Sequence, residues 1–260
     1  MKLLEYIILF FLTTAWASAA TLTRADSLFD LRNETFNPGT LIADSANVNQ
    51  SIALYQNILE SETENDIRHQ ALWKVLQAYY FKGQFTSKER SIRKRIYDRG
   101  IQIGQAYLEQ FPNSVEVHSW MGILWARWAE EYGIWAAAKK GVAAKIKTHA
   151  EKTIELDDAY LDAGGYRLLG MLHFSVPKIP LLLTWPSRDE ALSLLQKANR
   201  MAPKNLYNKL YLAQVLYAED QNEKAESLLK DILNANDIVH DIAVDSYLKH
   251  EAGHLLDEHS

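Results

Sequence analysis

Apolar side chains recur every three or four positions along most of the chain, which places them on one stripe of an α-helix. The clearest case is segment 115–132, where the stripe comprises Val117, Trp120, Met121, Leu124, Trp125, Trp128 and Tyr132. Similar patterns predict a helix from Asp44 or Ser45 to about Glu60, another from Asp66 to about Phe81, and a long helix that ends before Pro112. The pattern therefore predicts an all-α protein.

The predicted helices form pairs that repeat along the chain. Four residues stand in the same apolar context within the first helix of a pair: Gln77, Gly122, Gly170 and Ala213. Tetratricopeptide units, about 34 residues long, carry a small residue at this position and a second one twelve residues later. Ala213 and Ala225 have that spacing, whereas the three earlier units are longer between their helices. We expect an α-solenoid of about four TPR-like pairs, three of them expanded by inserts, plus capping helices.

The inserts are themselves apolar, at Gly133–Ala138 and Val176–Pro186. Exposed loops are usually polar, so we expect these segments to cover the concave face or a neighbouring subunit. Trp135 and Trp185 lie in the inserts and are candidates for lining a ligand site or a subunit contact. Three aromatics within helices complete the ligand-binding hypothesis, although packing in the core is the alternative for each: Trp125, Trp128 and Tyr166.

Composition narrows the class of function. The 260 residues are 48% hydrophobic and 23% charged, with only 11 glycines and 6 prolines, which suits helices throughout. The formal net charge of −5 argues against nucleic acid as a partner. The sequence contains no phosphate-cradling glycine loop, nucleophile elbow or paired-carboxylate signature. We therefore expect a protein without a cofactor that binds rather than catalyses.

The N-terminal residues have the pattern of a secretory signal peptide. A lysine at position 2 precedes an apolar stretch from Leu3 to Thr14, broken by Glu5, and small residues follow up to a cleavage site after Ala19 or Ala20. Residues 20–43 are expected to form an arm or a short lead-in helix, and 44–260 a single domain. The chain has no cysteine, hence neither disulfides nor a lipid-bearing residue at the cleavage site. A periplasmic location follows as the expectation.

One stretch resembles a known family. The run Gly164-Gly165-Tyr166-Arg167-Leu168-Leu169-Gly170, the proline-rich insert and the later Ala191, Leu195 and Ala198 are similar to the T-component (TatT) of TRAP transport systems. The resemblance covers roughly residues 45–235. It implies a self-associating periplasmic protein that partners a solute-binding protein and carries an apolar pore or cleft for a hydrophobic or organic-acid molecule. A eukaryotic family of microtubule-dynamics regulators shares this repeat style, but the predicted leader points away from it.

The segment His250-Glu251-Ala252-Gly253-His254 matches the H-E-x-x-H pattern of zinc peptidases. Such a site needs a third protein ligand, and few residues follow. The apolar stripe of Val244, Leu248, Ala252, Leu255 and Leu256 also turns both histidines toward solvent. A zinc-dependent peptidase is therefore an alternative function, and adventitious surface metal a weaker one.

A basic run lies between the second and third predicted helices. Arg90, Arg93 and Lys94 are candidates for docking an acidic partner or attracting an anionic solute, and a solvated helix face is the alternative. The sequence thus predicts an exported, non-enzymatic binding protein, most specifically an accessory of a TRAP-type uptake system. A generic periplasmic TPR scaffold without a small ligand is the other alternative.

Overall fold

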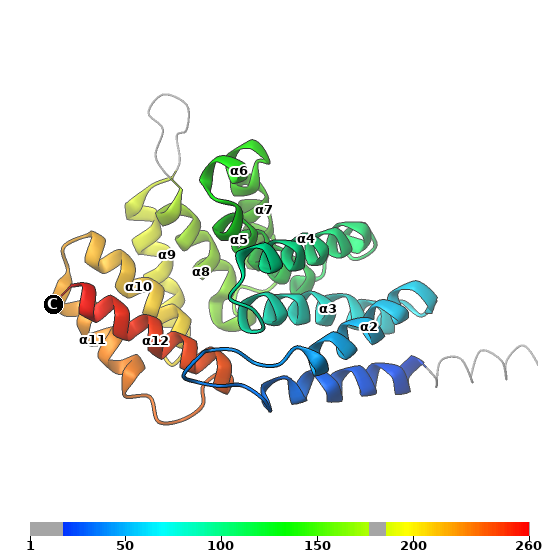
Figure 1. The fold of residues 1–260 in the computed structure, drawn as a ribbon. Helices are drawn as coiled ribbons and strands as arrows, with labels where there is room; N and C mark the ends of the chain where they lie inside the picture. The colour runs from blue at the N-terminus through cyan, green and yellow to red at the C-terminus, as the bar shows by residue number, and fades with distance from the viewer. Residues whose placement is uncertain (1–17, 177–185, 260) are drawn as a thin grey trace, which may run out of the picture. The chain divides into compact units, whose positions relative to one another are not determined.

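A computed structural model describes residues 18–176 and 186–259. The described chain is helical, and its contacts divide it into two compact units (Figure 1). Unit 1 comprises residues up to 36 together with 42–112, and unit 2 comprises residues 37–41 together with those from 113 onward. Within the described ranges, no helix is both long enough and apolar enough to cross a membrane. The predicted all-α solenoid is confirmed.

Unit 1 contains an N-terminal helix over residues 18–30 and three longer helices. The elements are η1 (Leu31–Asn33), α2 (Ala46–Ser61), α3 (Asn65–Phe85), α4 (Arg90–Tyr107) and η2 (Leu108–Gln110). The helices α2 and α4 both pack on α3. Their shared core includes Tyr55, Leu72, Leu76, Phe85 and Tyr97, each at most 1% exposed. Gly83 permits this packing, because a Cβ there would overlap the ring of Tyr97.

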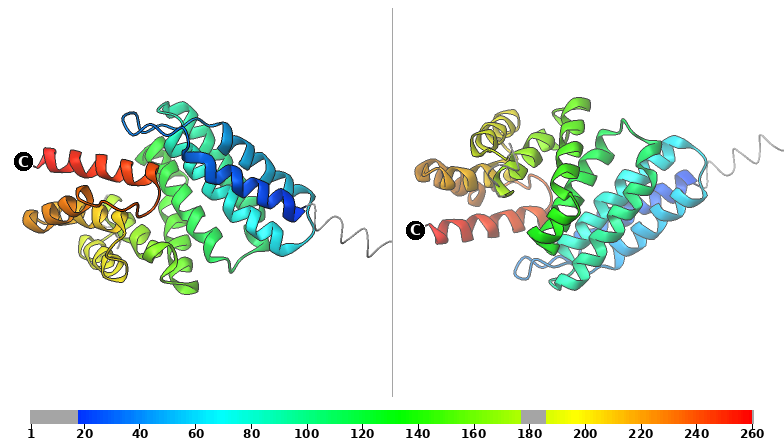
Figure 2. Two further views of the ribbon diagram at one scale, coloured as in Figure 1. Left: turned by 90° about the horizontal axis from the view of Figure 1, so that it is seen from below. Right: turned by 90° about the horizontal axis from the view of Figure 1, so that it is seen from above.

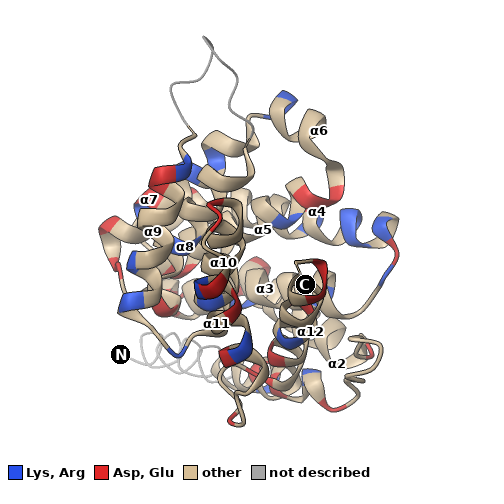
Figure 3. Cartoon of the chain, turned by 90° about the vertical axis from the view of Figure 1, so that its left-hand side faces the viewer, with Lys and Arg blue, Asp and Glu red and all other residues tan. Residues whose placement is uncertain are grey.

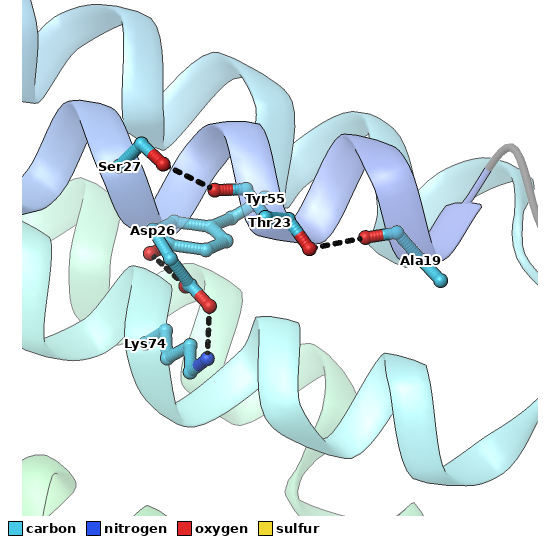
Figure 4. A network of polar contacts seen from close by, with 6 residues as sticks. All are labelled: Ala19, Thr23, Asp26, Ser27, Tyr55 and Lys74. Atoms are coloured by element: carbon cyan, nitrogen blue, oxygen red, sulfur yellow. Dashed lines mark hydrogen bonds and ion pairs between the residues drawn. The ribbon is translucent and has the colours of Figure 1, made fainter.

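The N-terminal helix lies along α2 and α3 (Figures 1 and 2). Leu22, Ala25 and Phe29 are buried at helical spacing, and the Phe29 ring meets Phe81 edge-on at 6.2 Å. On the same side, Asp26 accepts hydrogen bonds from the Tyr55 hydroxyl and the Lys74 ammonium (Figure 4). Residues 18–30 are thus the lead-in helix, one of the two forms that the sequence allowed. The first 17 residues of the predicted leader lie outside the described chain.

Unit 2 is built from helix pairs. Its helices are α5 (Val115–Tyr132), α6 (Ile134–Lys139), α7 (Val142–Leu156), α8 (Tyr160–Ser175), α9 (Arg188–Met201), α10 (Leu206–Ala218), α11 (Asn222–Leu233) and α12 (Ile242–Glu258). The pairs α5–α7, α8–α9 and α10–α11 form the repeats, and α12 packs on the last pair. Together with α3–α4 of unit 1, these are the four pairs that the repeat spacing predicted.

Glycines at the repeat positions lie where helices approach closely, within the α8–α9 pair at Gly170 and between neighbouring pairs at Gly122. A Cβ on Gly170 would lie 2.8 Å from the Leu195 Cγ, and one on Gly122 would lie 2.6 Å from the Leu168 Cδ2. Gly165 is equally constrained, since its Cβ would meet Ile154 at 2.7 Å. These distances are shorter than van der Waals contact, so any larger residue forces the helices apart. Gly165 thus permits close packing of α8 on α7.

Side chains fix where several of these helices begin. Ser114, Ser187 and Asn205 each accept a hydrogen bond from a backbone N–H in the first turn of the following helix. Asp241 does the same at the start of α12, accepting from two N–H groups. Each bond satisfies a donor that the helix itself leaves free. At α2 the cap comes from Asp44, whose carboxylate accepts from the Ala46 N–H at 2.6 Å.

Candidate functional site

The first helix of each pair contacts the first helix of the next pair, so α5, α8, α10 and α12 form one continuous face of unit 2. Five side chains on this face form a connected cluster, which we call the first-helix cluster: Arg127, Arg167, Tyr207, Tyr211 and His240. All five are half-buried. Half-buried arginine and tyrosine side chains on a repeat face are the residue types that protein interfaces use most.

Contacts run through the cluster from one helix to the next. The Arg127 guanidinium on α5 donates to the Tyr211 hydroxyl at 3.4 Å and forms an ion pair with Glu130. The Tyr211 and Tyr207 rings, one turn apart on α10, lie 5.8 Å apart. The Tyr207 ring then faces the Arg167 guanidinium of α8 at 5.6 Å. Three helices therefore supply one mixed basic and aromatic surface.

A left-handed turn at the start of α8 positions Arg167. Leu161, Asp162 and Ala163 all have positive φ, between 49° and 62°, which costs about 1–2 kcal/mol for each non-glycine residue. Arg167 donates to the carbonyls of Leu161 and Asp162, and the amide of Asn208 also donates to the Asp162 carbonyl. These bonds hold the turn. The same bonds also fix the Arg167 guanidinium beside the Tyr207 ring.

His240 lies in the connection between α11 and α12, where Asp245 orders the backbone. The buried Asp245 carboxylate accepts hydrogen bonds from the N–H groups of Val239 and His240. The His240 ring lies 5.5 Å from the Tyr207 ring, and its Nε2 is buried without a hydrogen-bond partner among the described residues. Burial lowers the pKa of His240, so the ring is neutral at pH 7.

A second histidine pair lies in the core between α5 and α7. The Nδ1 atoms of His118 and His149 are 3.0 Å apart, and both side chains are buried. One nitrogen must donate and the other accept, which neutral rings of complementary tautomers achieve. Burial, the neighbouring His118 and Lys145 together lower the pKa of His149 to about 4. This pair is a structural element of the core that the sequence analysis did not identify.

Comparison with known proteins decides the family. The sequence profile of the family "Regulator of microtubule dynamics protein 1-3" matches residues 40–260, which is most of the chain. The chain belongs to this family. No curated protein matches the sequence significantly. The sequence resemblance to the TatT family is not confirmed. The two families share the same repeat style, so the predicted leader was the feature by which the sequence analysis favoured TatT.

Solved structures show the fold of this family member. A thermophilic TPR protein from Thermus thermophilus, TTC0263, aligns with a TM-score of 0.59 and 12% identity over 92% of this chain and 99% of that one. MamA from Desulfovibrio magneticus RS-1 aligns with a TM-score of 0.47 and 13% identity over 80% of this chain and 92% of its own. The first similarity supports a TPR-like solenoid, and the second is too low to carry an argument.

Of the aromatic residues proposed to bind a ligand, Trp125 and Trp128 contact each other with ring centroids 5.9 Å apart. Trp125, Trp128 and Tyr166 are buried in unit 2, with the lysines at 145, 140 and 197 over their respective rings. Trp135 instead lies on α6 with 87% of its surface exposed, beside Ile134 at 51%. The helix of the first insert thus contacts α5 and α7 and leaves the Ile134 and Trp135 side chains exposed. Trp185 and residues 177–185 of the second insert lie outside the described residues.

The H-E-x-x-H segment lies on α12, as its spacing predicted. His250 and His254 are both exposed with their rings 4.5 Å apart, while Leu248 and Ala252 are buried. No cluster of three metal-ligating side chains occurs in the part of the chain that the structure describes. The Glu251 carboxylate lies 3.4 Å from the Nδ1 atom of His250, its neighbour in the sequence. The segment is thus a solvent-facing stretch of the capping helix.

Basic residues lie along α4 (Figure 3), and they differ in the contacts that they make. Arg93 donates to the carbonyls of Ser87 and Lys88 and so closes the turn before the helix. Arg90 is exposed and Lys94 half-buried. Further along the same helix, Arg95 and Arg99 turn toward α3, where they border a hollow with Lys82. Arg95 and Arg99 belong to the basic run that the sequence suggested for docking, whereas Lys82 on α3 was not identified from the sequence.

Proposed function

We propose that this protein is a non-enzymatic scaffold that binds a partner protein through the first-helix cluster of unit 2. The TPR-like fold supports the general role, since stacked helix pairs present an extended face to their partners. The first-helix cluster supports the proposed location of the partner-binding surface. Its contiguous arginine and tyrosine side chains on α5, α8 and α10 are the observation that carries the proposal.

The chemistry of the cluster favours an extended, acidic segment. Arg167 contributes positive charge, Arg127 contributes a guanidinium that is paired with Glu130, and Tyr207 and Tyr211 offer flat apolar area with a hydroxyl. Because backbone bonds hold Arg167 and His240 in place, little entropy is lost when a partner binds.

Two more specific roles rest on the comparisons and the sequence. Family membership supports a role in regulating microtubule dynamics, as the family's name states. The predicted leader and the TatT resemblance support an exported accessory of TRAP-type uptake, with a solute-binding protein as partner. Both roles use the same scaffold activity. The identity of the protein bound at the first-helix cluster separates them.

Site-specific photocrosslinking tests the proposal. Benzoylphenylalanine in place of Tyr211 should capture one discrete protein in cells of the source organism. The same reagent in place of Lys224, which is exposed on the second helix α11, should capture none and serves as the matched control. Equal capture at both positions, or at neither, would contradict binding at the first-helix cluster. Tubulin among the captured proteins would support the microtubule role, and a solute-binding protein the transport role.

A further inference from the structure

Unit 1 contains a second surface with its own chemistry, on the side where α4 packs against α3. A hollow of 290 Å³ lies there, lined by Tyr79, Lys82, Ile92, Arg95, Ile96 and Arg99. Three of these six side chains carry positive charge. Lys82 is half-buried, while Arg95 and Arg99 are exposed.

None of the three cations has an acidic partner among the described residues. The ion pairs of unit 1 leave out Lys82, Arg95 and Arg99, and the contact of Arg99 is with the Tyr79 hydroxyl rather than with a carboxylate. Lys82 is half-buried, and its burial lowers the pKa of the ammonium. Burying an unpaired cation is unfavourable for folding. Such a group is retained at little cost only where something else stabilises its charge, and a bound anion does so.

The neighbouring surface suggests what else the anion carries. A second hollow of 190 Å³ shares Arg99 and lies between α2 and α4. Its lining combines Leu59, Ile103, Ala106 and Tyr107 with the amide side chains of Gln56 and Gln102. Glu60 also borders this hollow. The apolar side chains suit an uncharged hydrocarbon portion, while the Glu60 carboxylate would repel a second negative group.

We propose that unit 1 binds a small organic monoanion, with its carboxylate among Lys82, Arg95 and Arg99 and its uncharged portion along α4 toward Leu59 and Ile103. Charge-assisted hydrogen bonds from two guanidinium groups and an ammonium would hold the carboxylate. The site lies in a different unit from the first-helix cluster, so it neither requires nor tests the scaffold role proposed above.

Titration calorimetry with octanoate, suberate and inorganic phosphate tests the site. Octanoate should bind with one-to-one stoichiometry, and its affinity should fall as ionic strength rises. Suberate has the same chain length but two carboxylates, and should bind at least about fivefold more weakly because of Glu60. Phosphate should bind more weakly than octanoate, since it leaves the second hollow empty. Absence of octanoate binding, or equal affinity for suberate, would overturn the proposal.

Substitutions locate the binding. Arg99→Gln and Lys82→Met should each weaken octanoate binding about tenfold, whereas Lys88→Gln should leave it unchanged. Lys88 is the matched control, because it is exposed, equally charged and outside both hollows. Lys82→Met should also raise the melting temperature of the unliganded protein, since it removes a half-buried, unpaired charge. Equal effects of Lys88→Gln and Arg99→Gln would show that general surface electrostatics accounts for the binding, and would refute the site.

Discussion

Asp26 on the N-terminal helix accepts a hydrogen bond from the Tyr55 hydroxyl of α2 at 2.7 Å (Figure 4). The second carboxylate oxygen accepts from Lys74 on α3 at 2.6 Å, so one side chain joins three helices. This contact lies beyond the predicted cleavage positions and would remain in a processed protein. It makes the lead-in helix part of unit 1.

Replacing Asp26 should therefore destabilise unit 1. Asp26→Ala leaves the buried Tyr55 hydroxyl and the Lys74 ammonium without their partner, which should lower the free energy of unfolding by about 1–2 kcal/mol. Ser27→Ala is the control on the same helix, since Ser27 is exposed and bonds only to the Thr23 carbonyl. Urea denaturation of both variants provides the measurement. Equal stability of the two would show that the helix is not held by this contact.

The glycine at the centre of the third repeat should tolerate no side chain. In Gly170→Ala the new methyl group meets Leu195 and the Ala191 carbonyl, and we expect a loss of about 1–3 kcal/mol. Gly253→Ala on α12 is the matched control. A Cβ there meets nothing within 4 Å, so this variant should gain about 0.5–1 kcal/mol from helix propensity. Thermal denaturation followed by circular dichroism should show melting shifts of opposite sign, and shifts of the same sign would refute the packing argument.

The His118–His149 pair should make stability depend on pH. The folded state lowers the pKa of His149 from 6.5 to about 4, so the unfolded chain binds the extra proton first as the pH falls. Stability should be fully present above pH 6.5 and decrease between pH 6.5 and 4, by roughly 3 kcal/mol for this group. Urea denaturation at several pH values measures the slope. His149→Asn should flatten it in this window, and an unchanged slope in the variant would assign the pH dependence to other groups.

Truncation of two tryptophans should change the free energy of unfolding by very different amounts. Trp125 is 3% exposed, and Trp125→Ala should cost about 3–5 kcal/mol. Trp135 is 87% exposed, so Trp135→Ala should change stability by less than about 0.5 kcal/mol. If the predicted self-association uses the first insert, the same Trp135 variant should sediment as a smaller species than the wild type. A large stability loss in Trp135→Ala would contradict its exposed position on α6.

The repeat architecture was predictable because it depends on spacing. The positions of Gly122, Gly170 and Ala213 mark where paired helices must approach closely, and the structure places a facing helix at each glycine. The lead-in helix was only one of two forms that the sequence allowed for its region. Its apolar stripe is short, and the residues that hold it, Tyr55 and Lys74, are distant in sequence.

The candidate sites were harder to predict because they combine residues from different helices. Tyr207 and Tyr211 are ordinary helix residues in the sequence, and become a surface only where Arg127 and Arg167 of other pairs reach them. Their spacing of four residues on a first helix was the available signal. The apolar insert at Trp135 is exposed within the described chain, and its predicted role in a ligand site or subunit contact stays a prediction.

The first-helix cluster is the central claim, and the affinity for the partner captured at Tyr211 tests it most directly. Isothermal titration should show that Tyr211→Ala and Arg127→Ala each weaken binding at least about tenfold, which corresponds to about 1.4 kcal/mol. Lys224→Ala on α11 should remain within about twofold of the wild type. Circular dichroism should confirm that all three variants stay folded. Wild-type affinity in both cluster variants would contradict the account.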